Sequence, residues 1–223
     1  MAAEVAGTPT GSARADVWAI GAAYEPYVGR WSRLVARELL GWLAIPPERR
    51  WLDVGCGTGA LSASILAHSA PREVVGIDPS DGYVAYAREH VVDPRVRFEV
   101  GDARALPCET GAFDAVVSGL VLNFVPEPQR AVAEMGRVCR QGGIVAAYVW
   151  DYADGMQAIR AFWDAAIELS PSAREVDEAV RFPLCTPDGL EKLLEGAGLL
   201  DVSTCAVDAS RPSATSTTTG RRS

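Results

Sequence analysis

The sequence predicts an α/β protein with a doubly wound, mostly parallel sheet, and two observations support this prediction. Short apolar segments with the length of strands alternate with longer segments of helical periodicity. Four polar residues, Asp53, Asp78, Asp102 and Ser118, fall near the ends of successive strands, at the edge where parallel sheets bind ligands. We expect strands at residues 51–54, 73–78, 95–100, 113–118, 144–150 and 199–207, and helices at 60–67, 81–91, 127–139, 156–169 and 186–196.

The composition is that of one globular domain. The chain has 223 residues, of which 48% are apolar and 22% are charged, and this length is sufficient for a packed α/β core. A net charge of −8 argues against a nucleic acid or an anionic membrane as partner, because phosphate groups are bound by basic surfaces. No apolar run is long enough to span a bilayer, and residues 1–15 lack the apolar centre of a signal peptide. We therefore expect a cytoplasmic protein.

The cysteine and histidine content agrees with that compartment and disfavours some kinds of chemistry. The five cysteines are an odd number and contain no C-x-x-C pair, so we expect free thiols, most of them buried. The only histidines are His68 and His90, which leave almost no material for a His-based metal site or a catalytic triad. We therefore predict no metal site.

A glycine-rich loop follows the first predicted strand. Gly55, Gly57 and Gly59 stand at alternate positions before a helical segment, where glycine permits positive φ angles and lets a ligand lie against bare backbone. The start of the helix adds unpaired N–H groups and the positive end of the helix dipole, which favour a polar or anionic part of a nucleotide-like ligand. Gly55, Gly57 and Ala60, with Asp78 about 20 residues further on, also fit the dinucleotide fingerprint G-x-G-x-x-G/A.

The longer string Asp-x-Gly-x-Gly-x-Gly, from Asp53 to Gly59, resembles the first motif of class I S-adenosylmethionine (SAM)-dependent methyltransferases. The resemblance implies that the backbone at Gly55, Cys56 and Gly57 lies along the methionine end of SAM. It also implies that the Asp53 carboxylate points toward the ammonium group of this cofactor.

Two more motifs agree with this resemblance. Asp78 ends the second strand, where its carboxylate can accept hydrogen bonds from both hydroxyls of a ribose, and Pro79 follows it in the predicted site. The alternative role of Asp78 is to cap helix 81–91. The string Gly-Asp-Ala around Asp102 resembles the adenine-contacting motif. It implies that Asp102 accepts a hydrogen bond from the adenine amino group and that the Ala103 N–H faces the ring.

The fourth strand and the N-terminal helix complete the predicted site. The strand 113–118 resembles the family's fourth motif, in which the strand end passes under the transferred methyl group, and this places Ser118 in the site. Residues 24–43 show an amphipathic helical pattern whose aromatic stripe includes Tyr24 and Trp31. We interpret this helix as a lid whose aromatic rings attract the sulfonium by cation–π interactions. Packing of the same stripe on the core is the alternative.

These segments predict a domain organisation. Residues 1–16 are disordered, and residues 17–208 form the methyltransferase domain, with a lid helix (17–47), a cofactor-binding core (48–150) and a substrate-binding cap region (151–185). Residues 209–223 contain no aliphatic residue larger than alanine and are predicted to be disordered. The resembled fold continues here with an antiparallel seventh strand between the fifth and the sixth, and we predict that this strand is absent.

The tail also supports a hypothesis about the gene. Residues 212–223 can be encoded with G+C-rich codons so that reading two bases later gives Val-Arg-Asp-Phe-Asp-Asp-Tyr-Trp-Ala-Pro-Phe, an amphipathic continuation that the resembled fold expects. We therefore expect the tail to be the product of a frameshift in a longer methyltransferase. The nucleotide sequence of the gene tests this expectation, because a downstream frame without a strand-like continuation would contradict it.

The predicted function is transfer of a methyl group from SAM to a small-molecule acceptor by in-line displacement. The resembled group includes the ubiquinone/menaquinone C-methyltransferase-like enzymes with a type 11 methyltransferase domain. Because the sulfonium is a good leaving group, alignment of the two reactants and exclusion of water are sufficient unless the acceptor must lose a proton. No residue stands out as a general base, so no catalytic residue is assigned. The alternatives are an NAD-dependent oxidoreductase and a SAM-binding module without catalysis.

Overall fold

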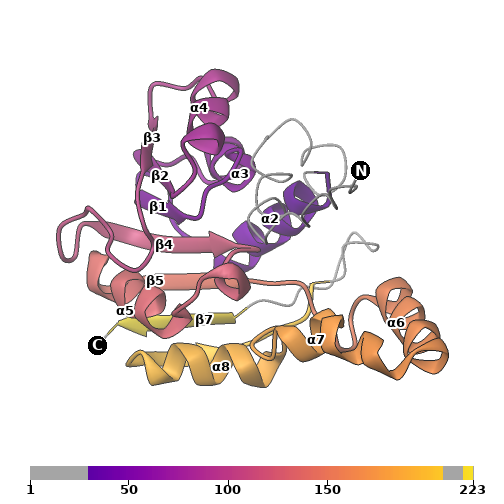
Figure 1. The fold of residues 1–223 in the computed structure, drawn as a ribbon. Coiled ribbons are helices and arrows are strands. Elements are labelled where there is room, and N and C mark those ends of the chain that lie inside the picture. Colours follow the sequence, from indigo (N-terminus) through magenta and orange to yellow (C-terminus); the bar gives the residue numbers. More distant parts are fainter. Residues whose placement is uncertain (1–29, 208–217, 223) are drawn as a thin grey trace, which may run out of the picture.

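The computed structural model describes residues 30–207 and 218–222. In this part of the chain, seven strands form one sheet in the order β3-β2-β1-β4-β5-β7-β6. The first five strands are parallel, and β7 is antiparallel to both of its neighbours (Figure 1). The order confirms the doubly wound, mostly parallel sheet, with its reversal between β1 and β4. The strands are β1 Arg50–Val54, β2 Glu73–Asp78, β3 Val96–Val100, β4 Phe113–Gly119, β5 Cys139–Tyr148, β6 Leu199–Ser203 and β7 Thr218–Arg222.

Helices cover both faces of the sheet. The helices α2, α3 and α4 pack on one face, and α5 and α8 pack on the other (Figure 1). Because both faces are covered, the inner strands are almost continuously apolar. None of the described helices has the length and apolar character needed to cross a membrane. The helices are α2 Arg30–Leu43, α3 Ala60–His68, α4 Asp81–His90, α5 Pro128–Val138, α6 Gln157–Leu169, α7 Glu178–Arg181 and α8 Pro187–Gly196, with two 3-10 helices, η3 Leu122–Phe124 and η4 Pro171–Val176.

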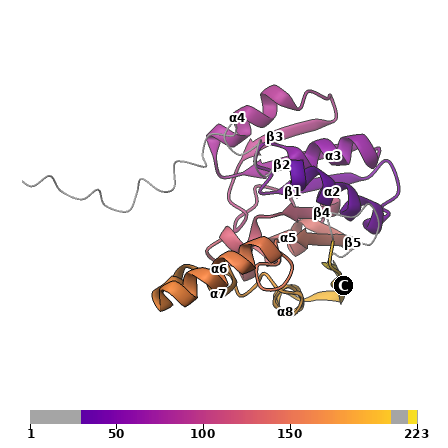
Figure 2. The ribbon, with the colours of Figure 1, turned by 90° about the vertical axis from the view of Figure 1, so that its right-hand side faces the viewer.

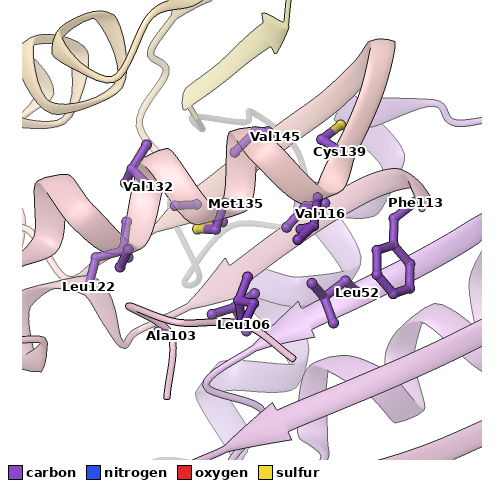
Figure 3. Close-up of a cluster of buried hydrophobic side chains, with 14 of the residues drawn as sticks. Leu52, Ala103, Leu106, Phe113, Val116, Leu122, Val132, Met135, Cys139 and Val145 are labelled. Atoms are coloured by element: carbon purple, nitrogen blue, oxygen red, sulfur yellow. The ribbon is translucent and has the colours of Figure 1, made fainter. Parts of the chain in front are cut away.

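Side chains of each inner strand alternate between two hydrophobic cores. In β1, Trp51 joins the core under α2 and α3, whereas Leu52 joins the core under α5 and α8. Figure 3 shows the second core, to which α5 contributes Val132 and Met135 and β4 contributes Val116. Because the side-chain period of a strand is two, Asp53 has the same orientation as Trp51 and faces α3.

A small cap, made of α6, η4 and α7, projects beyond the end of β5 (Figure 1) and lies apart from α3 and α4 (Figure 2). No residue of α6 is buried, so this helix is connected to α7 by a polar contact and not by a shared hydrophobic core. The buried Asp177 carboxylate accepts hydrogen bonds from Arg160 at 2.6 and 3.1 Å and from the Ala179 N–H at 2.9 Å. The Arg160 guanidinium holds the pKa of Asp177 below its usual range. Asp177 therefore both pairs with α6 and caps α7.

The prediction that the sheet lacks an antiparallel seventh strand is wrong. Thr218–Arg222 forms β7 between β5 and β6, with pairs such as Val145–Gly220 and Leu200–Arg221. The predicted disorder of residues 209–223 is therefore also wrong for 218–222, whereas 209–217 lie outside the described residues. The prediction relied on side-chain composition. Strands, however, pair through backbone hydrogen bonds, and the unpaired edges of two neighbouring strands can supply these bonds to a polar segment. The frameshift stays a hypothesis.

Candidate functional site

A cavity of about 840 Å³ lies at the carboxyl ends of the parallel strands, around the reversal between β1 and β4. This volume is typical of a site for a small molecule or cofactor. The loops that follow β1, β2 and β3 contribute most of the residues that we predicted to bind a cofactor. The predicted residues that line the cavity are Asp53, Gly55, Cys56, Gly57, Asp78, Pro79, Asp102 and Ala103.

The glycine-rich loop is held by backbone hydrogen bonds to the neighbouring strand. The N–H groups of Gly55 and Cys56 both donate to the Ile77 carbonyl oxygen, at 2.7 and 3.1 Å. Gly55 and Gly57 have φ angles of 73° and 50°, which glycine adopts at little cost. A Cβ atom at Gly57 would meet no atom within 4 Å. The backbone of Gly57 therefore borders open space in the cavity, as a loop that receives a ligand requires.

The Asp78 carboxylate connects this loop to the end of β2. Its Oδ2 accepts a hydrogen bond from the Gly57 N–H at 3.0 Å, and its Oδ1 accepts one from the Ser80 N–H at 2.9 Å. Burial raises the pKa of Asp78. Each oxygen keeps further capacity to accept, so the carboxylate can still bind two ligand hydroxyls. The helix cap that we considered for Asp78 is made by Ser80, whose hydroxyl accepts from the Tyr83 N–H at 3.3 Å.

Asp53 presents an unsatisfied oxygen in the same cavity. Its Oδ2 accepts a hydrogen bond from the Ser62 hydroxyl of α3 at 2.7 Å, whereas its buried Oδ1 has no partner among the described residues. The side chain is 1% exposed, and burial raises the pKa of Asp53 to about 7. A buried acceptor without a donor is costly unless a ligand supplies one. The site therefore fits a ligand that places a cationic donor beside Asp53.

Asp102 is engaged by an arginine that the sequence analysis did not consider. Arg104 donates to the Asp102 carboxylate from Nε at 3.1 Å, from Nη2 at 2.7 Å and from its backbone N–H at 2.8 Å. These contacts lower the pKa of Asp102 to about 2. Arg104 Nη1 also donates to Glu127 at 3.1 Å. A ligand amino group at Asp102 would share the carboxylate with Arg104, and the adenine-binding role of Asp102 stays a prediction.

Three predicted site residues are not placed in the cavity wall. Ser118 is fully buried, its Oγ has no hydrogen-bond partner among the described residues, and it does not line the cavity. It has the same orientation as Val116, which packs in the core under α5. Tyr24 lies outside the described residues, and so does the side chain of Trp31, whose backbone belongs to α2.

The end of β4 meets the cavity through Gly119, Leu120 and Val121 instead of Ser118. A Cβ atom at Gly119 would lie 2.5 Å from the Tyr148 hydroxyl oxygen, so glycine permits the close approach of this side chain. Leu120 has a φ angle of 61°, a conformation that is strained for leucine, and its N–H donates to the Tyr148 carbonyl oxygen at 2.8 Å. This turn brings Tyr148 to the cavity.

The wall of the cavity next to the cap is aromatic, and the sequence analysis did not predict its residues individually. The Phe182 ring packs against Phe124 and Tyr152 at centroid distances of 5.4 and 5.8 Å. A signal was available only for part of this wall, in the aromatic residues Tyr148, Trp150 and Tyr152 at alternate positions at and after the end of the fifth strand. The predicted cap region 151–185 supplies four lining residues. The lining residues that were not predicted as site residues include Ser32, Thr58, Leu61, Tyr83, Arg104, Gly119, Leu120, Val121, Phe124, Tyr148, Trp150, Tyr152, Glu178, Arg181 and Phe182.

The fold and the cavity together define a class of protein. A doubly wound sheet with a glycine-rich loop after β1 and an acid at the end of β2 is typical of proteins that bind a nucleoside-containing cofactor. Asp53 indicates which kind of nucleoside-containing cofactor the site can hold. A buried carboxylate beside the loop repels a pyrophosphate, whereas it attracts an ammonium group.

Comparison with known proteins identifies the family. The family model described as a methyltransferase domain matches residues 52–147. A ubiquinone/menaquinone biosynthesis C-methyltransferase from Methylobacterium nodulans is 31% identical over 180 residues, which are 72% of this chain and 71% of that protein. The chain belongs to the family of SAM-dependent methyltransferases.

Other relatives agree with this assignment. The trans-aconitate 2-methyltransferase of Deinococcus radiodurans is 29% identical over 171 residues, which are 75% of this chain and 65% of that protein. A chain in the Haloferax volcanii complex between the Trm112 methyltransferase activator and a methyltransferase shares the fold, with a TM-score of 0.70 at 18% identity over 92% of this chain and 96% of the other. Against three of the curated relatives, this chain spans only 34% to 65% of the relative's length.

Proposed function

We propose that this protein transfers a methyl group from SAM to a small-molecule acceptor. The observation that carries the proposal is the pair of buried carboxylates, Asp53 and Asp78, beside the glycine-rich loop. Asp53 offers an unpaired oxygen to the ammonium group of SAM, and Asp78 offers two oxygens to the ribose hydroxyls. Membership of the methyltransferase family supports the same assignment.

The chain's own residues bind, orient and exclude water. When bound, SAM supplies a methyl group on a sulfonium that is already a good leaving group. The remaining task of the protein is to hold the acceptor in line with this methyl group in a space without water. The nearly buried rings of Tyr148 and Tyr152 border that space. We assign no general base, because Asp53 and Asp78 lie at the loops after β1 and β2, where the cofactor is expected.

Calorimetric titration of the purified chain with S-adenosylhomocysteine (SAH), with NADH as control, tests the cofactor. We expect saturable binding of SAH and no binding of NADH. Methyl transfer is then tested by SAH formation from SAM in the presence of quinols, phenols, amines and small carboxylic acids. Binding of NADH without binding of SAH would favour an NAD-dependent oxidoreductase. Binding of SAH without transfer to any acceptor would favour a SAM-binding module.

The affinity for SAH should fall as the pH is lowered below about 7, because Asp53 must be ionised to pair with the ammonium group. Below the pKa of Asp53, binding must release its proton, so the dissociation constant should rise about tenfold per pH unit. Calorimetry at several pH values measures this slope. The Asp53→Asn variant should bind SAH weakly and without the slope. A slope that persists in this variant would belong to Asp78, whose pKa is also raised, and would contradict the role of Asp53.

The proton on Asp53 also affects the stability of the protein without ligand, and here a rise in pH is unfavourable. The folded protein holds the proton on Asp53 up to about pH 7, whereas the unfolded chain releases it near the ordinary aspartate pKa of 3.8. The contribution of Asp53 to the free energy of unfolding should therefore decrease as the pH rises from about 4 to about 7.

We also propose a class of methyl acceptor and a cellular compartment. The names of the two curated relatives described above differ, since one refers to ubiquinone/menaquinone biosynthesis and the other to trans-aconitate. We infer a small-molecule acceptor from this group. None of the five cysteines forms a disulfide in the described part of the chain, which supports our expectation of a reducing compartment such as the cytoplasm.

A further inference from the structure

The cavity has two sides with different walls. The side formed by the loops after β1 and β2 holds the buried acids Asp53 and Asp78, which we assign to the cofactor. The other side lies beyond the end of β4 and is formed by η3, the end of β5, the segment that follows β5, and the cap. Aromatic rings on several sides of one space suit a planar, largely apolar molecule. The aromatic residues of this second side are Phe124, Tyr148, Trp150, Tyr152 and Phe182.

Two arginines line the described part of the cavity, and they differ in how their charge is neutralised. Arg104 forms ion pairs with Asp102 and Glu127 at 2.7 and 3.1 Å. The Arg181 guanidinium makes no ion pair or hydrogen bond with any described residue, and it lies 5.2 Å from the centroid of the Phe182 ring. The acid one turn earlier, Glu178, accepts a hydrogen bond from the indole N–H of Trp163 instead. The Arg181 charge is therefore available to a ligand.

The position of Arg181 is determined by the contacts of α7. The Asp177 carboxylate caps this helix through the Ala179 N–H and pairs with Arg160 of α6. The Phe182 ring under the guanidinium packs in turn against Phe124 and Tyr152. A cation that lies on the face of an aromatic ring keeps its N–H donors free at the ring's edge. Arg181 thus stands at the end of the aromatic wall.

We propose that the methyl acceptor is an anionic small molecule with a planar apolar body, whose carboxylate or phosphate group binds Arg181. This inference rests on the proposed function, because it gives that function a substrate class. The aromatic wall holds the body of the acceptor, and the planar guanidinium fork binds an oxyanion in two-point fashion. The reacting atom of the acceptor then lies at the opposite end of the body, toward Gly119 and the cofactor side.

The experiment uses the full chain saturated with SAH and titrated calorimetrically with matched probes. The probes are 4-hydroxybenzoate, its neutral counterpart 4-hydroxybenzamide, and 4-hydroxyphenyl phosphate. We expect the benzoate to bind about tenfold tighter than the benzamide, since a charge-assisted pair to arginine is worth about one order of magnitude at a partly exposed site. Comparison of the benzoate with the phosphate distinguishes the two oxyanions. In Arg181→Gln the preference for an anion should disappear, while the affinity for the benzamide stays unchanged.

Arg174→Gln is the matched control. Arg174 is exposed in η4 of the same cap and does not line the cavity, so this variant should keep the preference. Equal affinities of the wild-type chain for all three probes, no binding of any probe, or an equal loss in Arg174→Gln would overturn the inference. Failure of SAH itself to bind would overturn the proposed function and the inference together. Intact SAH binding without preference for an anion would overturn the inference alone.

Discussion

The Asp78→Ala variant should lose at least tenfold of its affinity for SAH, which is about 1.4 kcal/mol. The carboxylate holds the Gly57 N–H at 3.0 Å and the Ser80 N–H at 2.9 Å, and it is the group that we assign to both ribose hydroxyls. Removing it should delete the proposed contacts with the ribose and release the Gly57 backbone of the loop. Calorimetric titration with SAH, after the melting temperature has shown that the variant is folded, measures the effect.

Two further variants test whether the effect of Asp78→Ala comes from the lost ligand contact or only from the lost negative charge. Asp81→Ala removes an exposed acid of the first turn of α4 that does not line the cavity, so it should bind SAH as the wild type does. Asp78→Asn keeps one oxygen that can accept a hydrogen bond and should fall between the wild type and Asp78→Ala. An unchanged affinity in a folded Asp78→Ala protein would remove Asp78 from the cofactor site.

The Gly55→Ala variant should be destabilised by about 2–4 kcal/mol and should bind SAH poorly. A Cβ atom at this position would lie 2.5 Å from Val121 Cγ1, and the φ angle of 73° is unfavourable for alanine. The loop after β1 would therefore be pushed away from the end of β4. Urea unfolding followed by fluorescence measures the change in the free energy of unfolding.

Other glycines of the chain provide the controls for this prediction. Gly57→Ala meets no atom within 4 Å but has a positive φ, so it should cost about 1 kcal/mol of stability and act mainly by projecting a methyl group into the cavity. Gly41→Ala lies in α2 with open space around its Cβ and should stabilise the helix by about 0.5–1 kcal/mol. If the clash is the cause, Val121→Ala should restore part of the stability of Gly55→Ala. A Gly55→Ala protein of wild-type stability would contradict the argument.

Much of the cofactor side of the site could be predicted from local sequence. The strands β1 and β2 are short apolar runs, and Asp53 and Asp78 stand at their carboxyl ends. A parallel sheet brings these ends to one edge, whatever lies between them in the chain. The glycine-rich loop follows from backbone requirements that the sequence states directly, since Gly55 and Gly57 both adopt positive φ angles.

Contacts between distant segments decided the rest. Ser118 was assigned to the cavity by its position at a strand end, but the residue is fully buried and does not line the cavity. The wall around Phe182 and Arg181 depends on how the cap folds back, through the ion pair between Arg160 and Asp177.

The C-terminal strand shows the same division most clearly. The sequence by itself determined the parallel sheet, the loop after β1 and the two acids beside it, because hydrophobic periodicity and glycine positions are local properties. Only the tertiary structure decided that Thr218–Arg222 enters the sheet between β5 and β6. This segment has no apolar pattern that predicts a strand. Its strand forms through pairing with the backbone groups of β5 and β6. Such pairing depends on edges that exist only once the sheet has formed.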